Sequence, residues 1–512
     1  MKPVARPTNA DTVPYWSTSS TFPRFAKLAE DTEADIVVVG GGISGLTAAY
    51  LLAQAGKRVV VLERDRCVAT DTGHTSAHLT MVTDTGLSEL ASRVGRTHAQ
   101  AVWDAGRAAI AKIDEIVGEL DLDAGFDWVD GYLHAPRGDV TDEQLERLRA
   151  DAKLAGELGF SAEYLESVPL VGLPGVRFAN QARIHPRRYL GGLAKAIVGL
   201  GGRIHEHSEA EEFCDDPRRV KANGHAVRCE AVVIATHNPV VGFGNVAGST
   251  VFQTKLALYT SYVVAGSVDR GVVPDALWWD TADPYNFLRI DPRHDRDVVI
   301  LGGEDHKTGQ EEDTAARYRR LEGDLRAIIP TVKLTHRWSG QVIETPDGLP
   351  YIGESSDHQY SGTGYAGNGL TFGTLAGIMI SDEILGRANP WSELFDPGRK
   401  ALARGLWDYI KENADYPYYL IRDRIGGAQA QSVRAIKRGH AKIIDRNGAK
   451  VAAFRDTAGK LTLRSATCTH MGCLVHWNTA EQTWDCPCHG SRFKPTGEVI
   501  SGPAETSLSE VE

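Results

Sequence analysis

Residues 35–63 read DIVVVGGGISGLTAAYLLAQAGKRVVVLE, and this stretch decides the fold. The apolar run 35–39 predicts a buried parallel strand, the glycines within 40–45 predict a tight turn, and 46–55 predicts a helix whose small residues face a sheet. A second apolar run, 58–62, predicts the next strand. The stretch therefore predicts a βαβ unit and, with it, an α/β, Rossmann-like domain.

The glycines of this turn have the spacing of a dinucleotide-binding loop. Gly40 allows the turn, Gly42 lets the backbone approach a pyrophosphate, and Gly45 permits close packing of helix on strand. The N-terminus of the helix offers N–H groups to phosphates, and Glu63 is placed to accept hydrogen bonds from a ribose. The alternative is a chance glycine turn. The contacts predicted here are Gly40, Gly42, Ile43, Ser44, Gly45, Glu63 and Arg64.

A second glycine-rich loop, GFGNVAG at 242–248, looks like another such turn. It follows Asn238-Pro239 rather than a buried strand, so a flexible crossover between domains is a better interpretation than a nicotinamide site. One dinucleotide site is therefore predicted.

Three further segments carry a family resemblance. They are VVIAT at 232–236, TPDGLPYIG at 345–353 and GTGYAGNGLTFGT at 362–374. Together with the N-terminal turn, they resemble the D-amino-acid oxidase and sarcosine oxidase superfamily of FAD enzymes over about residues 35–387. The resemblance implies FAD as the cofactor and places the last segment under the isoalloxazine ring.

The resemblance also implies further flavin contacts. An ordinary glycine-rich helix entry is the alternative for the last segment. Some members of the family attach the flavin covalently, which leaves His74 or His78 as alternatives to simple backbone contact in the segment after the second strand. The implied contacts are Thr75, Ser76, Ala235, Thr236, Gly364, Gly367, Asn368, Gly369, Leu370 and Thr371.

Cysteines and histidines crowd the C-terminal end of the chain. CTHMGC at 468–473 and CPCHGS at 486–491 contain a C-x-H and a C-x-x-H pair. This is the Rieske arrangement, in which two thiolates hold one iron and two imidazoles the other iron of a 2Fe-2S cluster. The predicted iron ligands are Cys468, His470, Cys486 and His489. A zinc knuckle is the alternative, because zinc also takes cysteine and histidine.

Both boxes resemble those of respiratory Rieske proteins. That resemblance implies a disulfide between Cys473 and Cys488 that braces the cluster loops, and a hydroxyl donor to a cluster sulfur at Ser491. A flavin oxidoreductase followed by a Rieske domain resembles a recognised bacterial family, and this likeness covers nearly the whole chain.

The predicted fold is an α/β FAD-binding Rossmann-like domain interleaved with an α+β mixed-sheet substrate domain, followed by an all-β Rieske domain. Both of the first two domains are expected to be discontinuous. The expected parts are an N-terminal extension (1–34), the FAD-binding domain (35–85, 180–245 and 335–390), the substrate domain (86–179 and 246–334), a connecting arm (391–427) and the Rieske domain (428–512).

Composition excludes several classes of protein. The formal net charge of −11 argues against a general nucleic-acid or anionic-membrane binder, and seven cysteines in 512 residues are too few for a disulfide scaffold. The N-terminus has no apolar core typical of a signal peptide, and no stretch approaches the ~20 apolar residues of a membrane helix. We therefore expect a soluble cytoplasmic protein.

The segment 252–301 is the best candidate for the wall of a substrate pocket. Arg289 could pair with a substrate carboxylate, and Tyr259 and Tyr285 could bound the cavity. A surface ion pair with a nearby aspartate is the alternative for Arg289, and a place in the core is the alternative for Tyr285.

These features predict an FAD-dependent oxidoreductase. We expect it to dehydrogenate a C–N bond of a small amine or amino acid by hydride transfer to flavin, with electrons leaving one at a time through the Rieske cluster to an external one-electron carrier. One alternative is a reductase or monooxygenase that receives electrons through the cluster. Another is a redox-sensing or electron-transfer protein without small-molecule turnover. The sequence gives no prediction of the oligomeric state.

Overall fold

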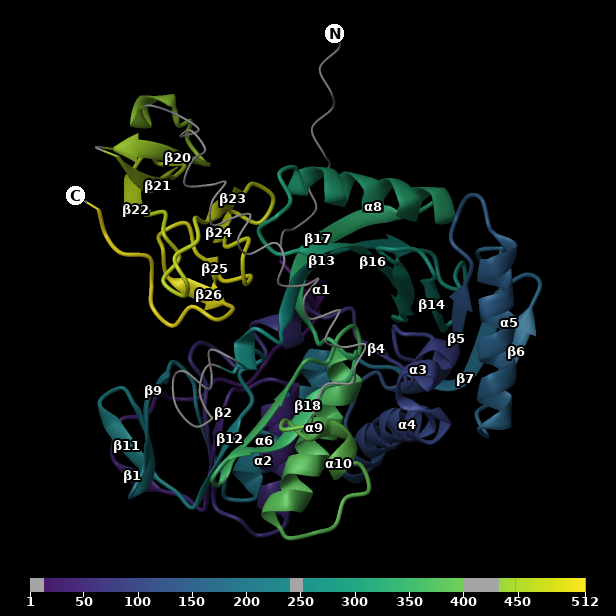
Figure 1. The fold of residues 1–512 in the computed structure, drawn as a ribbon, viewed down its shortest axis with the longest axis horizontal. Coiled ribbons are helices and arrows are strands. Elements are labelled where there is room, and N and C mark those ends of the chain that lie inside the picture. The colour runs from purple at the N-terminus through teal and green to yellow at the C-terminus, as the bar shows by residue number, and fades with distance from the viewer. Residues whose placement is uncertain (1–12, 240–251, 400–431, 447, 512) are drawn as a thin grey trace.

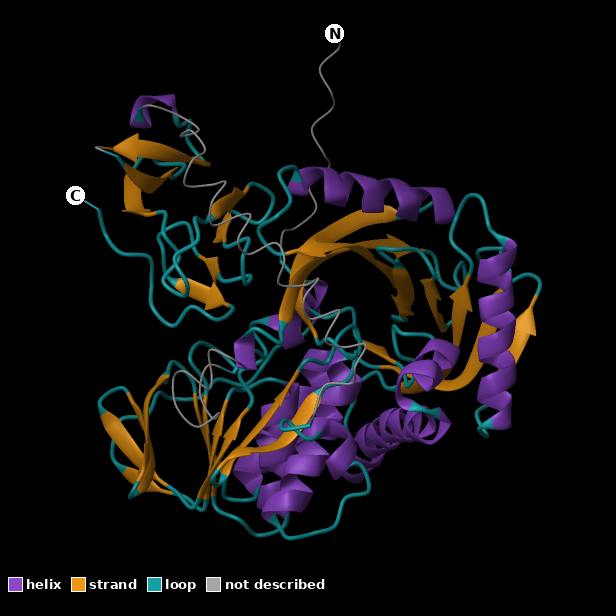
Figure 2. Cartoon of the chain, in the orientation of Figure 1, coloured by secondary structure: helices purple, strands orange, loops and turns teal. Residues whose placement is uncertain are grey.

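A computed structural model describes residues 13–239, 252–399, 432–446 and 448–511 of the chain. Two large sheets with their helices form the body, and a smaller C-terminal domain of strands with one short 3₁₀ turn, η2 (Val433–Ala435), lies beside it (Figures 1 and 2). The fold is thus an α/β Rossmann-like domain interleaved with a mixed-sheet domain and followed by an all-β domain, as predicted. The loop at 242–248, most of the expected connecting arm and the first twelve residues lie outside the described residues.

The predicted βαβ unit forms the centre of a six-stranded sheet. Its strands follow the order β18-β19-β12-β2-β3-β8, in which only β18 runs antiparallel to its neighbour. Helix α2 packs against α6 and α9 (Figure 1). The bounds are β2 (Ile36–Val39), α2 (Ile43–Gln54), β3 (Val59–Leu62), α6 (Pro186–Gly199), β8 (Arg203–His205), β12 (Ala231–Ile234), β18 (Tyr351–Ser356), β19 (Gln359–Thr363) and α9 (Gly369–Ile384).

A nine-stranded mixed sheet forms the second unit. Its order is β17-β13-β16-β15-β14-β5-β7-β4, with β6 paired to β7, and helix α8 (Thr314–Ile328) covers one face (Figure 1). The strands are β4 (His78–Leu79), β5 (Asp127–His134), β6 (Ala162–Leu165), β7 (Gly175–Arg183), β13 (Ala257–Val268), β14 (Ala276–Asp280), β15 (Phe287–Asp291), β16 (Asp297–Lys307) and β17 (Lys333–Glu344).

Side chains alternate across β13, so this strand separates two environments. Tyr262 and Val264 belong to the cluster under α8, whereas Val263 and Ala265 belong to the main core that includes the dinucleotide-turn helix. Strand β13 lies between β16 and β17. These three strands therefore form a wall with one face toward the main core and the other toward α8.

Three helices lie between β4 and β6. Gly95, with a φ of +85°, ends α3 (Leu87–Val94) and precedes α4 (Arg96–Glu119). Helix α5 (Asp142–Glu157) begins with a capping box, in which Thr141 and Gln144 each bond to the backbone of the other.

Three features of the body were not anticipated from the sequence. A small sheet of order β1-β11-β10-β9 extends the first unit. Strands β7 and β17 belong wholly to the nine-stranded sheet, so they cross the domain boundaries expected at 179/180 and at 334/335. In the N-terminal extension, α1 (Tyr15–Ser19) inserts the fully buried Trp16 into the body. The small sheet consists of β1 (Thr32–Glu33), β9 (Ala210–Asp215), β10 (Arg218–Ala222) and β11 (His225–Arg228).

The C-terminal domain consists of two small antiparallel sheets around its own core. The first sheet contains β20 (His440–Arg446), β21 (Ala449–Arg455) and β22 (Leu461–Ser465), and the second contains β23 (His476–Asn478), β24 (Thr483–Asp485), β25 (Arg492–Phe493) and β26 (Val499–Ser501). Among the described residues, no helix is long and apolar enough to cross a membrane.

Candidate flavin and iron-sulfur sites

The dinucleotide turn is built around close backbone contacts. Gly40 has a φ of +110°, and a Cβ there would overlap the carbonyl oxygen of Ala235 at the end of β12. A Cβ on Gly45 would overlap the carbonyl oxygen of Gly40, and one on Gly42 would lie 3.0 Å from Thr72 Oγ1. At Gly40 and Gly45 only glycine fits without moving the backbone, so the turn keeps the shape that lets a pyrophosphate approach closely.

Glu63 lies at the carboxyl end of β3, beside this turn. Its carboxylate accepts hydrogen bonds from the backbone N–H of Gly41 (2.8 Å) and of Asp65 (2.9 Å). Burial raises the pKa of Glu63, and these two N–H donors oppose that shift. The carboxylate is thus fixed where the predicted ribose would lie, and the residues present fit a bound dinucleotide.

The predicted flavin loop at the start of α9 is fixed by three hydrogen bonds to residues 80–84. Gly367 N donates to Asp84 Oδ2 (3.0 Å), Asn368 Nδ2 donates to Val82 O (3.0 Å), and Thr371 Oγ1 donates to Thr80 O (3.1 Å). The start of α9 is therefore tied to the chain that follows β4.

The neighbouring segment, residues 74–78, is held by the N-terminal extension and by strands of the nine-stranded sheet. Trp16 Nε1 donates to Thr75 O (2.7 Å), and Ser76 Oγ lies 3.1 Å from His78 Nδ1. His78 Nε2 donates to Leu288 O (3.2 Å), and burial lowers its pKa to about 3, so its ring is neutral. His74, in the 3₁₀ turn η1 (Asp71–His74), donates from Nδ1 to Ser339 O (2.6 Å).

Arg64 is placed differently from the expectation. Its guanidinium donates to Ile500 O of the C-terminal domain (2.6 Å) and lies 3.8 Å from Glu209. Because the side chain is exposed and reaches across to another domain, the structure gives it a partner outside the dinucleotide turn.

Arg289 does not line the predicted pocket, which corrects the expectation of a substrate partner. The side chain is fully buried, and its guanidinium donates to the carbonyl oxygens of Ala77 (2.5 Å) and Ile184 (3.1 Å). It lies 5.5 Å from the ring of Trp16, and burial lowers its pKa to about 10. It also lies 3.8 Å from Asp291, so the alternative of an ion pair with a nearby aspartate is present, although the pair is buried and not at the surface.

Tyr285, by contrast, lies at the predicted flavin loop. A Cβ on Gly367 would overlap the Tyr285 hydroxyl and lie 2.7 Å from Asp84 Oδ2. The Tyr285 hydroxyl donates to the Asp84 carboxylate, and burial together with the charges of Asp84, Asp305 and Glu344 raises its pKa. We call Asp84, Tyr285, Asp305 and Glu344 the acid cluster. Tyr259, the third predicted residue, is half-buried on β13 between Val342 and Lys307.

A β-bulge positions Asp305 in this cluster. The register of β13 and β16 shifts between Thr260 and Tyr262, opposite Gly303 (φ +143°) and Glu304 (φ +60°). Glu304 pairs with Arg320 on α8, whereas Asp305 interacts electrostatically with Asp84 and Tyr285 on the other side of the sheet. Burial and the Asp84 charge raise the pKa of Asp305 to about 7, and its Oδ1 is inaccessible and has no hydrogen-bond partner.

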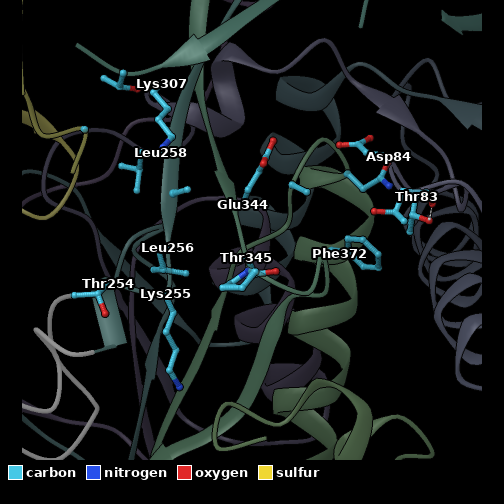
Figure 3. A pocket seen from close by; sticks show the side chains of 18 of the residues that line it. Thr83, Asp84, Thr254, Lys255, Leu256, Leu258, Lys307, Glu344, Thr345 and Phe372 are labelled. Atoms are coloured by element: carbon cyan, nitrogen blue, oxygen red, sulfur yellow. Dashed lines mark hydrogen bonds between the residues drawn. The ribbon is translucent and has the colours of Figure 1, made fainter. Parts of the chain in front are cut away.

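A cavity of about 530 Å³ opens beside this cluster. Asp84, Glu344 and Phe372 line one part of it and Lys255, Leu258 and Lys307 another (Figure 3), while His489 of the C-terminal domain also contributes to its wall. The grouping of Asp84, Asp305 and Glu344 has no signal in the sequence, because these residues come from three elements far apart in the chain.

The predicted iron ligands meet at the ends of two loops of the C-terminal domain. Cys468 and Cys486 are buried and hydrogen-bonded through their thiols, which lowers the pKa of Cys468 to about 7. The rings of His470 and His489 lie 5.0 Å apart, and burial lowers the pKa of each to about 4, so both are neutral.

Cys473 and Cys488 are joined by a disulfide, as the resemblance implied. Their sulfurs lie close to that of Cys486, but a disulfide leaves no thiolate to bind metal. Two thiols and two neutral imidazoles remain. This donor set fits a Rieske cluster, in which two thiolates hold one iron and two imidazoles hold the other.

Comparisons with known proteins agree with this geometry. A family model described as FAD dependent oxidoreductase matches residues 35–383. The chain belongs to the FAD-dependent oxidoreductase family. A second model, for the Rieske [2Fe-2S] domain, matches residues 428–512 of this oxidoreductase. Its cofactors are therefore FAD and a 2Fe-2S cluster.

Relatives share the whole arrangement or the flavin part of it. The "Putative Rieske 2Fe-2S iron-sulfur protein YhfW" of Bacillus subtilis (strain 168) is 33% identical over 505 residues, covering 97% of each protein. Glycine oxidase from Geobacillus kaustophilus (TM-score 0.58, 17% identity, 72% of this chain and 99% of that one) and L-proline dehydrogenase from P. horikoshii (TM-score 0.58, 20% identity, 72% and 98%) have the fold of the oxidoreductase's flavin part.

Proposed function

We propose that this oxidoreductase dehydrogenates a C–N bond of a small amine or amino acid and passes the electrons singly through its Rieske domain to an external one-electron carrier. The observation that carries this proposal is the acid cluster beside the predicted flavin loop, on a cavity whose wall also includes a predicted iron ligand, His489. The names of glycine oxidase and L-proline dehydrogenase, which share the fold, support the same substrate class.

The charges around the cavity favour a substrate with an amino group. Asp84 and Glu344 line the cavity, and Asp305 interacts with Asp84. The side chains of Asp84 and Glu344 are exposed to the cavity, where carboxylates attract an ammonium group. Lys307, on another part of the cavity wall, offers a partner for a substrate carboxylate, so amino acids remain in the proposed class although Arg289 points elsewhere.

The chain's own groups then move one proton. When bound, FAD supplies a two-electron acceptor for the hydride of the C–H bond next to nitrogen, and the 2Fe-2S cluster supplies one-electron transfer. Asp84, as the carboxylate that lines the cavity, accepts the proton of the substrate ammonium, which frees the nitrogen lone pair to form the C=N bond of an imine. Tyr285 and Gly367 N hold Asp84 in place, and Asp305 interacts with it electrostatically.

The rate of flavin reduction should follow the ionisation of Asp84. Because burial raises the pKa of Asp84 and the proposed base is the carboxylate, the limiting rate should rise with pH and level off once Asp84 is ionised. Asp84→Asn should lower the rate by about 10²–10⁴-fold and abolish this inflection. Stopped-flow bleaching of the flavin at saturating substrate, from pH 5.5 to 8.5, measures both.

Glu304→Gln is the matched control for this prediction. Glu304 is a carboxylate of the nine-stranded sheet but pairs with Arg317 and Arg320 on the α8 side, so this variant should keep the inflection. An inflection that survives in Asp84→Asn would show that another group is the base.

An anaerobic substrate panel tests the proposed function. Small primary and secondary amines and amino acids are each mixed with the oxidised protein, and the matching alcohols and carboxylic acids without nitrogen serve as controls. At least one nitrogen compound should bleach the flavin, and none of the controls should. If no compound bleaches it but a reduced ferredoxin does, the chain is a reductase or monooxygenase fed through its cluster. If no compound supports turnover with any acceptor, a sensor is the better interpretation.

A cytoplasmic location and the lack of a nucleic-acid partner stay predictions from composition.

A further inference from the structure

We propose that the Rieske domain is held in fixed contact with the flavin body through Gly309, Gln341 and Gly490, so that electrons pass between FAD and the cluster within one chain. We call these three residues the interdomain joint. The proposal concerns the path between the two cofactors and does not depend on the identity of the substrate.

Gln341 is the centre of the interdomain joint. It lies on β17 and is 5% exposed. Its side-chain Nε2 donates to Gly490 O (2.8 Å), next to the iron ligand His489, and its Oε1 accepts from Ser501 Oγ (2.5 Å). Both hydrogen-bonding ends of one amide are thus used by the Rieske domain.

The same strand contacts the predicted flavin segment. Gln341 N donates to Asp71 Oδ1 (3.1 Å), and Ser339 O accepts from His74 Nδ1 (2.6 Å). Trp338 Nε1 donates to His74 O (2.8 Å). Asp71 and His74 belong to η1, the turn that faces the dinucleotide glycines through Thr72. Strand β17 therefore joins the flavin-side turn directly to the loop that carries an iron ligand.

Glycines allow the backbones of the two domains to meet. Gly309 has a φ of +82°, and a Cβ there would lie 2.7 Å from both Cys486 C and Pro487 N. A Cβ on Gly490 would lie 2.6 Å from Leu258 Cβ on β13. Neither distance leaves space for a side chain, so the cluster loop rests on the body through backbone contact.

Further bonds hold the Rieske domain from two sides. Glu481 accepts from Tyr318 on α8 (2.5 Å) and from Ser339 Oγ (2.7 Å). His476 Nδ1 donates to Gly309 O (2.8 Å). Arg64 reaches Ile500 O from the end of β3. Because these bonds come from four different parts of the body, a swing of the domain would break all of them together.

The consequence is a short path for electrons. Each two-electron oxidation of substrate leaves two electrons on the flavin, and the cluster accepts one at a time and must pass it to a one-electron carrier before it accepts the next. Tunnelling rates fall steeply with distance, and His489 lines the same cavity as Asn368 of the flavin loop. A fixed contact of this kind favours transfer inside the chain over transfer to a neighbour.

Light-driven reduction tests this without a substrate. The flavin is photoreduced by a flash with EDTA as the sacrificial electron donor, and reduction of the cluster is followed by rapid-freeze EPR. In the wild type, the rate of cluster reduction should be independent of protein concentration. A rate that rises in proportion to concentration would overturn the proposal.

A mixture of two chains gives the same test independently. One chain carries Cys486→Ser and has FAD but no cluster, and the other is wild type from which FAD has been removed. The flash should leave the cluster of this mixture oxidised. Cluster reduction at the wild-type rate would show transfer between chains.

Variants of the interdomain joint test its residues. Gly309→Ala and Gln341→Leu should each slow cluster reduction at least about tenfold, because a small displacement of reacting groups is costly. The EPR line shape and the midpoint potential from redox titration should stay as in the wild type. Gly323→Ala, at an open position on α8, is the matched control and should keep the wild-type rate. Wild-type rates in both joint variants would contradict the role assigned to these residues.

Discussion

Cys486→Ser should remove the EPR signal of the cluster completely and leave bleaching of the flavin by substrate unchanged. Cys486 is 2% exposed and pairs with Cys468, so it is one of only two thiols available in this ligand set. A serine hydroxyl does not replace the thiolate that iron requires. Steady turnover with a one-electron acceptor should fall to background, since the electrons then have no exit.

The outcome separates the two directions of electron flow. If electrons enter at the substrate, the flavin accepts them with or without a cluster. If they enter at the cluster, Cys486→Ser abolishes both the EPR signal and flavin reduction, and the proposed order is wrong. Cys214→Ser is the control, because Cys214 is partly exposed on β9 in the small sheet of the flavin body. It should change neither signal.

Gly45→Ala should yield a folded protein that lacks FAD. The added Cβ would overlap the carbonyl oxygen of Gly40, so the turn must move away from the position that permits a pyrophosphate to approach. The FAD content should fall below about a tenth of one per chain. The ratio of flavin to protein absorbance measures it, and circular dichroism checks that the fold is kept.

Gly118→Ala provides the comparison for this change. Gly118 is also helical, in α4, but a Cβ there meets nothing within 4 Å. That variant should hold one FAD per chain. Full FAD content in Gly45→Ala would mean that the predicted turn is not the dinucleotide site.

Local motifs account for what the sequence could predict. The dinucleotide turn and the two cysteine–histidine boxes each place their residues within a few positions of one another, so spacing alone indicates their geometry. The apolar strand runs are local in the same way. The α/β class, the dinucleotide site and the iron ligands followed from these features, whereas FAD as the dinucleotide was implied by the resemblance of three further segments to a family of FAD enzymes.

The acid cluster could not be found in this way. Asp84 follows β4, Asp305 sits beside a bulge in β16, and Glu344 ends β17, so only the tertiary fold brings them to Tyr285. Arg289 shows the opposite problem. Its sequence neighbours suggested a pocket or a surface, but its partners are the carbonyl oxygens of Ala77 and Ile184, more than a hundred residues away. Sequence spacing carries no information about such contacts.

The central claim is that electrons enter at the substrate, reach the flavin first and then the cluster of the same chain. The most direct measurement mixes the oxidised holoenzyme anaerobically with the amine or amino acid found in the panel, and follows flavin absorbance and cluster EPR in samples frozen at successive times. The account predicts that the flavin bleaches first and that the EPR signal of the reduced cluster follows at a rate independent of protein concentration. Appearance of the cluster signal before any bleaching, or a flavin that is reduced only through the cluster, would contradict it.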